Sequence, residues 1–147
     1  MREFDVCLHL CKKERKINER IEEINTKLYT PKCQDLSGMP KGGGNSESFL
    51  DKLVDEKLEL LDKRAEVRVM KEHNQKAAIL LMKHCNISDE QQHLIASRFF
   101  NGLKWKKCGV EMTKYTGEKW DENKVFRTYR SILSRIEQHK NKLLEHN

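Results

Sequence analysis

Two sets of polar and basic residues in the last third of this sequence have the chemistry to bind nucleic acid. An Arg side chain can form a pair of hydrogen bonds with the edge of guanine, and an Asn side chain with the edge of adenine. We therefore expect base contacts from Asn123, Lys124, Arg127 and Thr128. Contacts to phosphate position a protein without reading the base sequence. We expect them from Lys104, Lys106, Lys107, Arg130 and Arg135.

The charge of the chain is concentrated in the same region. Residues 98–147 contain 12 Lys and Arg and 6 Asp and Glu, whereas residues 1–97 contain 17 of each, so the net charge of +6 lies in the C-terminal part. No acidic residue occurs between Asn123 and Arg135, although helices that are merely solvated often mix Glu with their cations at i,i+4 spacing. A localised basic surface favours phosphate binding. The alternative is a solvated basic helix without a ligand.

The other reactive residue types do not form a catalytic or metal-binding pattern. The five cysteines have an odd count and irregular spacing, which argues against a disulfide framework. Cys7 and Cys11 would share a helical face near His9, yet no second pair follows at zinc-type spacing, so we interpret them as buried apolar residues. Asp121 and Glu122 fit a helix N-terminus better than a catalytic pair. We expect no enzyme, no metal site and no cofactor.

The first part of the chain predicts two long helices joined by a linker. Apolar residues recur every seven positions in residues 4–29 and in residues 46–84, a spacing typical of a narrow seam between packed helices. Residues 30–45 contain both prolines and four of the seven glycines. We expect an antiparallel, coiled-coil-like helical hairpin as the first domain, over residues 1–85. Its seams consist of Leu10, Ile17 and Ile24, and of Leu53, Leu60 and Val67.

The second part of the chain, residues 86–147, predicts a unit of three shorter helices. They cover about residues 88–101, 104–112 and 121–145, and a polar turn covers residues 113–120. A capping box and a terminal glycine support these bounds. These signals are Ser88 with Gln91, and Gly102.

The last predicted helix has one apolar face. We expect this face to pack against Phe99, Leu103, Trp105 and Val110, so that its basic residues point away from the core. A helix-turn-helix has this construction, and it places its second helix in the DNA major groove. We therefore expect an all-α fold. The apolar face consists of Val125, Tyr129, Ile132, Leu133 and Ile136.

The sequence also predicts a cytoplasmic protein that does not enter membranes. No apolar stretch approaches the roughly 20 residues that span a bilayer. Charged residues interrupt every apolar segment near the N-terminus, which argues against a signal peptide.

Two motifs resemble known families. The string Arg98-Phe99-Phe100-Asn101-Gly102-Leu103 resembles the start of region four of sigma factors, and residues 125–136 resemble the recognition helix of that module. The long helices with the loop Leu36-Ser37-Gly38-Met39-Pro40 are similar to small phage and prophage transcriptional regulators of the ArpU and RinA type. This sequence departs from the family pattern at two places. At residues 114–120 we expect a longer turn than in the family, and Cys108-Gly109 stands where an Ile-Ala pair is usual.

The resemblance implies a phage-type transcriptional regulator that binds double-stranded DNA sequence-specifically and acts on a phage operon. RNA polymerase and a second copy of the chain, joined through the helical hairpin, are the further expected partners. Two alternatives stay open. One is an adaptor that binds RNA polymerase or a sigma factor through its hairpin. The other is a DNA-binding protein of phage packaging.

Overall fold

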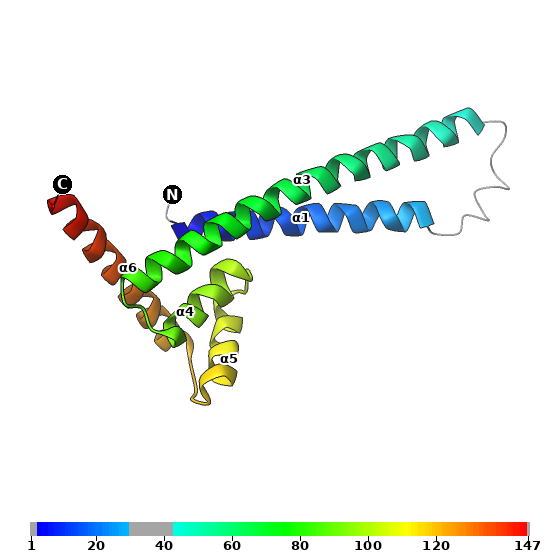
Figure 1. The fold of residues 1–147 in the computed structure, drawn as a ribbon. Helices are drawn as coiled ribbons and strands as arrows, with labels where there is room; N and C mark the ends of the chain where they lie inside the picture. The colour runs from blue at the N-terminus through cyan, green and yellow to red at the C-terminus, as the bar shows by residue number, and fades with distance from the viewer. Residues whose placement is uncertain (1–2, 30–42, 147) are drawn as a thin grey trace. The chain divides into compact units, whose positions relative to one another are not determined.

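The computed structural model describes residues 3–29 and 43–146, with side chains described from Phe49 onward in the second range. All regular structure in these ranges is helical, which confirms the expected all-α class. Most of the predicted linker lies outside the described residues. The elements are α1 (Glu3–Tyr29), α3 (Gly43–His84), α4 (Asp89–Ile95), a π-helical segment (Ala96–Phe100), α5 (Trp105–Thr116) and α6 (Glu122–Glu145) (Figure 1).

The chain forms two compact units. Unit 1 contains residues 1–12 and 70–147, and unit 2 contains residues 13–69. The division falls inside α1 and inside α3. Among the described residues, no helix has both the length and the apolar character needed to cross a membrane.

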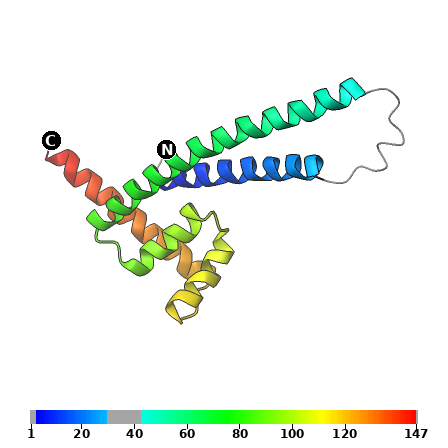
Figure 2. The same cartoon turned by 45° about the vertical axis from the view of Figure 1, so that its right-hand side comes forward.

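Charged and polar side chains join α1 to α3 within unit 2. The Arg20 guanidinium donates two hydrogen bonds to the Glu56 carboxylate, from Nε to Oε1 at 2.7 Å and from Nη2 to Oε2 at 3.0 Å. Two further pairs are Arg64 Nη1 to Asn18 Oδ1 at 3.0 Å and Arg68 Nε to Glu14 Oε2 at 2.9 Å. From one pair to the next, the residue of α3 lies later in the sequence and the residue of α1 lies earlier. The two segments therefore run antiparallel (Figure 1 and Figure 2).

Apolar residues fill the contact between these two segments. Ile17 and Ile24 of α1 and Leu53 and Val67 of α3 are buried, as the seven-residue spacing predicts, and Leu60 is half-buried. Burial of such side chains removes apolar area from water and is the main favourable term that holds helices together.

Unit 1 contains two groups of buried side chains. The first group combines residues of α1, α3, the π-helical segment and α6, among them Phe4, Cys7, Met82, Phe99 and Ile132. The second group lies between α4, α5 and α6 and consists of Leu94, Cys108, Met112, Trp120 and Val125. Together these groups bury one face of α6 and leave its opposite face exposed.

The start of α4 agrees with its sequence signal. The Ser88 hydroxyl accepts a hydrogen bond from the Gln91 amide at 3.2 Å, and the Ser88 amide donates to Gln91 Oε1 at 3.3 Å. This is the predicted capping box. Gly102 follows the π-helical segment with a φ of 71°, a left-handed conformation that glycine adopts at low cost.

The turn before α6 is shorter than predicted. The expected turn over residues 113–120 is wrong because α5 continues to Thr116, and only residues 117–121 separate α5 from α6. The hydroxyls of Thr113 and Thr116 donate to the carbonyls of Gly109 and Met112 at 2.8 and 2.9 Å, so these polar residues fit within the helix. Gly117, with a φ of 79°, then ends α5.

Two side chains near this turn are also placed differently from expectation. Trp120 falls in the predicted polar turn, but it is buried against the second core group. Its amide donates to Thr113 Oγ1 at 3.0 Å, and its indole Nε1 donates to Thr116 Oγ1 at 3.1 Å. Val110 was expected in the core, yet 52% of it is exposed, because Cys108 and Met112 occupy the inward positions of α5.

Candidate nucleic-acid interface

The orientation of α6 follows from its cap and its apolar face. The Asp121 carboxylate accepts a hydrogen bond from the Lys124 amide at 2.7 Å and so starts the helix. Val125, Ile132 and Ile136 are buried at helical spacing. Because these residues face the core, the side chains on the opposite side of α6 must point outward.

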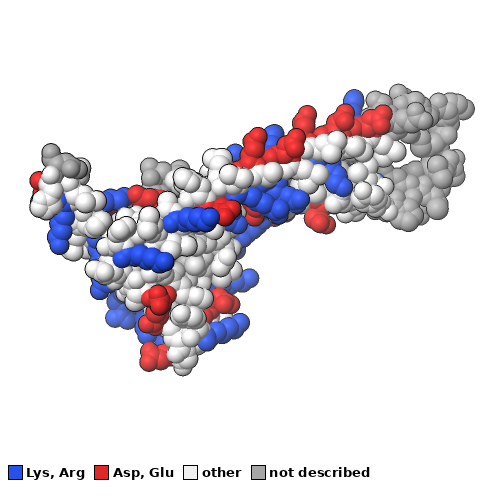
Figure 3. All heavy atoms as spheres, viewed as in Figure 1, with Lys and Arg blue, Asp and Glu red and all other residues white. Residues whose placement is uncertain are grey.

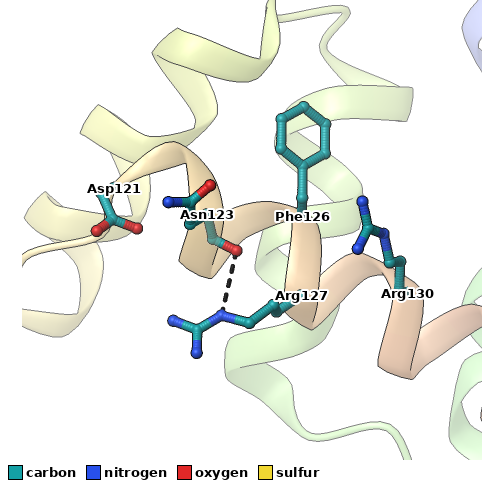
Figure 4. Close-up of a pocket in the computed structure, with 5 residues that line it drawn as sticks. All are labelled: Asp121, Asn123, Phe126, Arg127 and Arg130. Atoms are coloured by element: carbon teal, nitrogen blue, oxygen red, sulfur yellow. Dashed lines mark hydrogen bonds between the residues drawn. The ribbon is translucent and has the colours of Figure 1, made fainter.

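Four residues of the outward side line an open hollow of about 450 Å³, together with Asp121 (Figure 4). They are Asn123, Phe126, Arg127 and Arg130. In Figure 4, Phe126 and Arg130 lie on one side of the helix, and Arg127 extends from the other side back toward the first turn. Its Nε donates to the Asn123 carbonyl at 3.4 Å, and its terminal nitrogens form no hydrogen bond or ion pair with the part of the chain that the structure describes.

A second open hollow lies between α4 and α6. It is lined by Gln91 from α4 and by Lys124, Arg127, Thr128 and Ser131 from α6. Arg127 therefore contributes to both hollows. The structure brings all four predicted base-contact residues to the first half of α6, where they border one or both hollows.

The four predicted base-contact residues differ in whether their polar atoms already contact other residues of the protein. Lys124 Nζ lies 3.7 Å from Glu118 Oε2 and 4.4 Å from the centre of the Trp120 ring, so its cation is bound to the turn. The Thr128 hydroxyl donates to the Lys124 carbonyl at 2.8 Å. Asn123 and Arg127 are exposed. These last two residues have the polar atoms that are best placed to meet a ligand.

The predicted phosphate-binding lysines gather at the beginning of α5. Lys104, Lys106 and Lys107 are exposed, and none of them makes a hydrogen bond or ion pair with a side chain in the described part of the protein. The first turn of α5 contains no acidic residue, and Lys104, its N-cap, makes no side-chain capping bond. A helix N-terminus carries a partial positive charge, which adds to the charges of these lysines. Lys106 also lines one hollow with Asp121 and Glu122.

The two predicted phosphate-binding arginines of α6 are in different situations. Arg130 is exposed, lines the first hollow and has no bonded partner among the described residues. The Arg135 guanidinium donates from Nη1 to the Asn86 carbonyl at 3.3 Å. Arg130 was predicted to contact phosphate, but it lines the same hollow as the predicted base-contact residues Asn123 and Arg127.

Arg98 and Trp105 position the beginning of α5 against α6. Arg98 Nη1 donates to the Leu103 carbonyl at 2.9 Å, and its guanidinium lies 4.9 Å from the Trp105 ring centre. The Trp105 ring contacts Phe126 and Tyr129 of α6 at centroid distances of 5.2 and 4.9 Å. Phe126 was missed at the sequence level, although its spacing from Asn123 and Arg130 places it on the same side of a helix.

Acidic residues border the basic ones. In the view of Figure 3, Lys and Arg spheres alternate with Asp and Glu spheres over the part of unit 1 where α4 and α5 lie. In unit 1, Glu111 pairs with Lys114 and Glu118 pairs with Lys124, each at 3.7 Å. The acids therefore neutralise cations of the turn and of α5, but they leave Arg127 and Arg130 without a carboxylate partner in the described chain.

The cysteines and acids do not form a reactive centre in the described part of the chain. Cys7, Cys11, Cys85 and Cys108 are buried, free thiols. Burial raises the pKa of Cys7 and the pKa of Cys108 to about 11, so both hold their protons at neutral pH. The described residues contain no group of three or more His, Cys, Asp or Glu side chains suited to a metal ion.

Comparisons of the chain with protein families, curated proteins and solved structures found no match.

Proposed function

We propose that this chain binds double-stranded DNA sequence-specifically, with α5, the turn over residues 117–121 and α6 acting as a helix-turn-helix. The observation that carries this proposal is the outward face of α6. Asn123, Arg127 and Arg130 border one hollow there, and no acidic residue follows until Glu137. An α-helix fits the major groove, and recognition helices contact bases mainly through their N-terminal residues.

Within this proposal, Asn123 and Arg127 make the principal base contacts. Their side chains are exposed near the start of α6, and they can form paired hydrogen bonds with adenine and guanine. Phe126 offers an apolar surface that suits the methyl group of thymine. Lys124 and Thr128 lie on the flank toward Gln91, and we assign them supporting contacts to bases from that side.

The phosphate contacts come from both helices. Lys104, Lys106 and Lys107 are presented at the beginning of α5, where the free backbone amides of a helix N-terminus also favour an anion. Arg130 and Arg135 extend this cationic set along α6. Such contacts fix the register of a protein on the duplex, while base contacts specify the sequence.

We also propose, from the resemblance to phage regulators and to sigma region four, that DNA binding serves transcription regulation of a phage operon. The helical hairpin formed by α1 and α3 would then meet another protein. RNA polymerase and a second copy of the chain are the partners expected from the sequence.

The test begins with selection of duplexes from a random pool by the full-length chain. We expect an enriched sequence that binds roughly 10³-fold or more tightly than a scrambled duplex. Replacing Asn123 and Arg127 by Ala should remove most of this preference, because each bidentate contact contributes about 1–3 kcal/mol of discrimination. The measurement is fluorescence anisotropy with the enriched and the scrambled duplex at one salt concentration.

Arg15→Ala is the matched control, because it removes the same charge from an exposed position of α1 in unit 2. It should leave the preference intact. Failure of the pool to enrich any sequence would contradict sequence-specific binding. If the pool enriches a sequence but the Asn123→Ala, Arg127→Ala variant keeps the full preference for it, DNA binding would stand and only the assignment of these two residues to base contacts would be contradicted.

A further inference from the structure

Helix α3 carries a row of acidic side chains within unit 2. The row consists of Asp51, Asp55, Glu59, Asp62 and Glu66, spaced four, four, three and four residues apart. This spacing places them on one face of the helix. All five are exposed, and none forms an ion pair with a described side chain. Figure 3 shows acidic spheres along α3.

Repulsion within this row is only partly offset by cations of the same helix. Like charges at i,i+3 and i,i+4 repel each other, and the exposed Lys52 and Lys63, which stand at these spacings from members of the row, form no ion pair with it among the described residues. The pairs Asp51 with Asp55, Asp55 with Glu59, and Asp62 with Glu66 are all of the i,i+4 kind. A cationic partner along this face would relieve the repulsion.

An apolar stripe runs beside the acidic row. Each acidic residue directly follows an apolar one, and these apolar residues are Leu50, Val54, Leu58, Leu61 and Ala65. The exposed fractions of Leu50, Val54 and Leu58 are 39%, 42% and 56%. The seam toward α1 uses other residues, Leu53 and Val67, which are buried. Among the described residues of unit 2, α3 therefore has two apolar stripes, one buried against α1 and one partly exposed.

We propose that this face of α3 binds a basic amphipathic helix of a partner protein. The partner's apolar stripe would pack on Leu50, Val54 and Leu58, and a row of Lys or Arg on its flank would pair with the acidic row. Helices that dock in this way anchor apolar residues at i, i+3, i+4 and i+7 positions. This inference does not depend on the proposed DNA binding, because all of its residues lie in unit 2.

Charge also argues against α3 of a second copy of the chain as the occupant. A second α3 packed antiparallel on the same stripe would set one acidic row against the other. A parallel copy would need cations on the other flank, where Lys57 and Arg64 lie. Arg64 is bonded to Asn18 at 3.0 Å, and Lys57 Nζ lies 5.4 Å from the centre of the Tyr29 ring. Both cations therefore already contact residues of α1 within unit 2.

The test uses the full-length chain and a synthetic helical peptide with a Leu stripe and a flanking row of Lys. A second peptide has Glu in place of every Lys. We expect the Lys peptide to bind at least about tenfold more tightly than the Glu peptide, because several surface charge pairs add up along one face. The Asp55→Lys, Asp62→Lys variant should lose this preference. Binding is measured by isothermal titration calorimetry.

Two further variants separate the face from general effects of charge. Glu19→Lys with Glu22→Lys makes the same charge change on exposed positions of α1 and should keep the preference. Asp55→Asn with Asp62→Asn is the milder change, which should weaken Lys-peptide binding while circular dichroism shows an unchanged helix content.

Absence of peptide binding, equal affinity for both peptides, or equal loss in the Glu19, Glu22 control would overturn the proposal. A dimer in analytical ultracentrifugation that Leu58→Lys dissociates would also overturn it, because the face would then belong to a second copy.

Discussion

Lys124 and Arg127 are both cations in the first half of α6, yet their surroundings differ. The Lys124 ammonium lies against Glu118 and the Trp120 ring. Among the described residues, the Arg127 guanidinium bonds only to the backbone of its own helix. Sequence spacing assigned both residues to base contacts with equal weight. The difference in their partners makes Arg127 the better candidate for reading a base, and Lys124 a residue that also stabilises the turn.

The buried thiols give a residue-scale prediction about pH. Burial raises the pKa of Cys7 and of Cys108 from 9.0 to about 11. Between pH 9.0 and about pH 11, the unfolded chain loses thiol protons that the folded chain keeps, so unfolding becomes more favourable as the pH rises. The stabilising contribution is complete below pH 9.0 and should fall as the pH rises toward about 11. Urea unfolding followed by circular dichroism at several pH values measures this slope.

The control for this prediction is Cys108→Ala, which removes one of the thiols whose pKa is raised by burial. Its free energy of unfolding should depend less steeply on pH in the same range, whatever its value at neutral pH. A slope equal to that of the unchanged chain would show that Cys108 does not contribute.

At the scale of elements, the contact of α5 with the turn before α6 depends on Gly109. A Cβ atom at this position would lie 3.0 Å from the Trp120 carbonyl oxygen and 3.7 Å from Val125 Cγ2. Glycine inside a helix costs roughly 1 kcal/mol relative to Ala. This cost is offset here because the backbone of the turn can approach α5 closely enough for Trp120 to bond with Thr113 and Thr116.

Gly109→Ala should therefore destabilise the protein despite the better helix propensity of Ala. We expect a loss of about 1–3 kcal/mol in the free energy of unfolding, the range for side chains forced into a packed site. Urea unfolding measures it. Val110→Ala changes an exposed neighbour on the same helix and should stay within about 0.5 kcal/mol of the unchanged chain. A gain in stability for Gly109→Ala would contradict the close approach.

Much of the element level could be predicted from the sequence. The periodic apolar residues gave the inward faces of α1 and α6, and Ser88 with Gln91 gave the start of α4. The end of α5 could not be predicted in the same way, because Thr113 and Thr116 look like turn residues. Their hydroxyls bond with backbone carbonyls and with Trp120, and the Trp120 contacts form only when the turn folds back.

At the scale of the whole molecule, the net charge of the chain lies in its C-terminal part. Five cations of that part, Lys104, Lys106, Lys107, Arg130 and Arg135, are the proposed phosphate contacts. Each phosphate that a protein neutralises releases condensed counterions, so binding weakens as salt rises. Five contacts predict that log K against log salt falls with a slope of about −4 to −5 for one chain on duplex DNA.

Lys106→Ala should reduce the steepness of this slope by about 1 and weaken binding to all duplexes alike, because a phosphate contact carries no sequence information. The measurement is anisotropy with the enriched and the scrambled duplex over a salt series. Lys16→Ala, at an exposed position of α1, is the matched control and should leave the slope unchanged. A salt-independent affinity would argue against phosphate contacts and favour a protein partner instead.

The sequence by itself determined that the chain is helical and which faces α1 and α6 bury, because helical periodicity, capping and charge clustering are properties of neighbouring residues. Only the tertiary structure decided where α5 ends, that Val110 is exposed and Trp120 buried, and that Arg130 shares a hollow with Asn123 and Arg127. These outcomes depend on contacts between α5, the turn and α6. Local sequence patterns do not encode such contacts, because the partner of each side chain comes from another element.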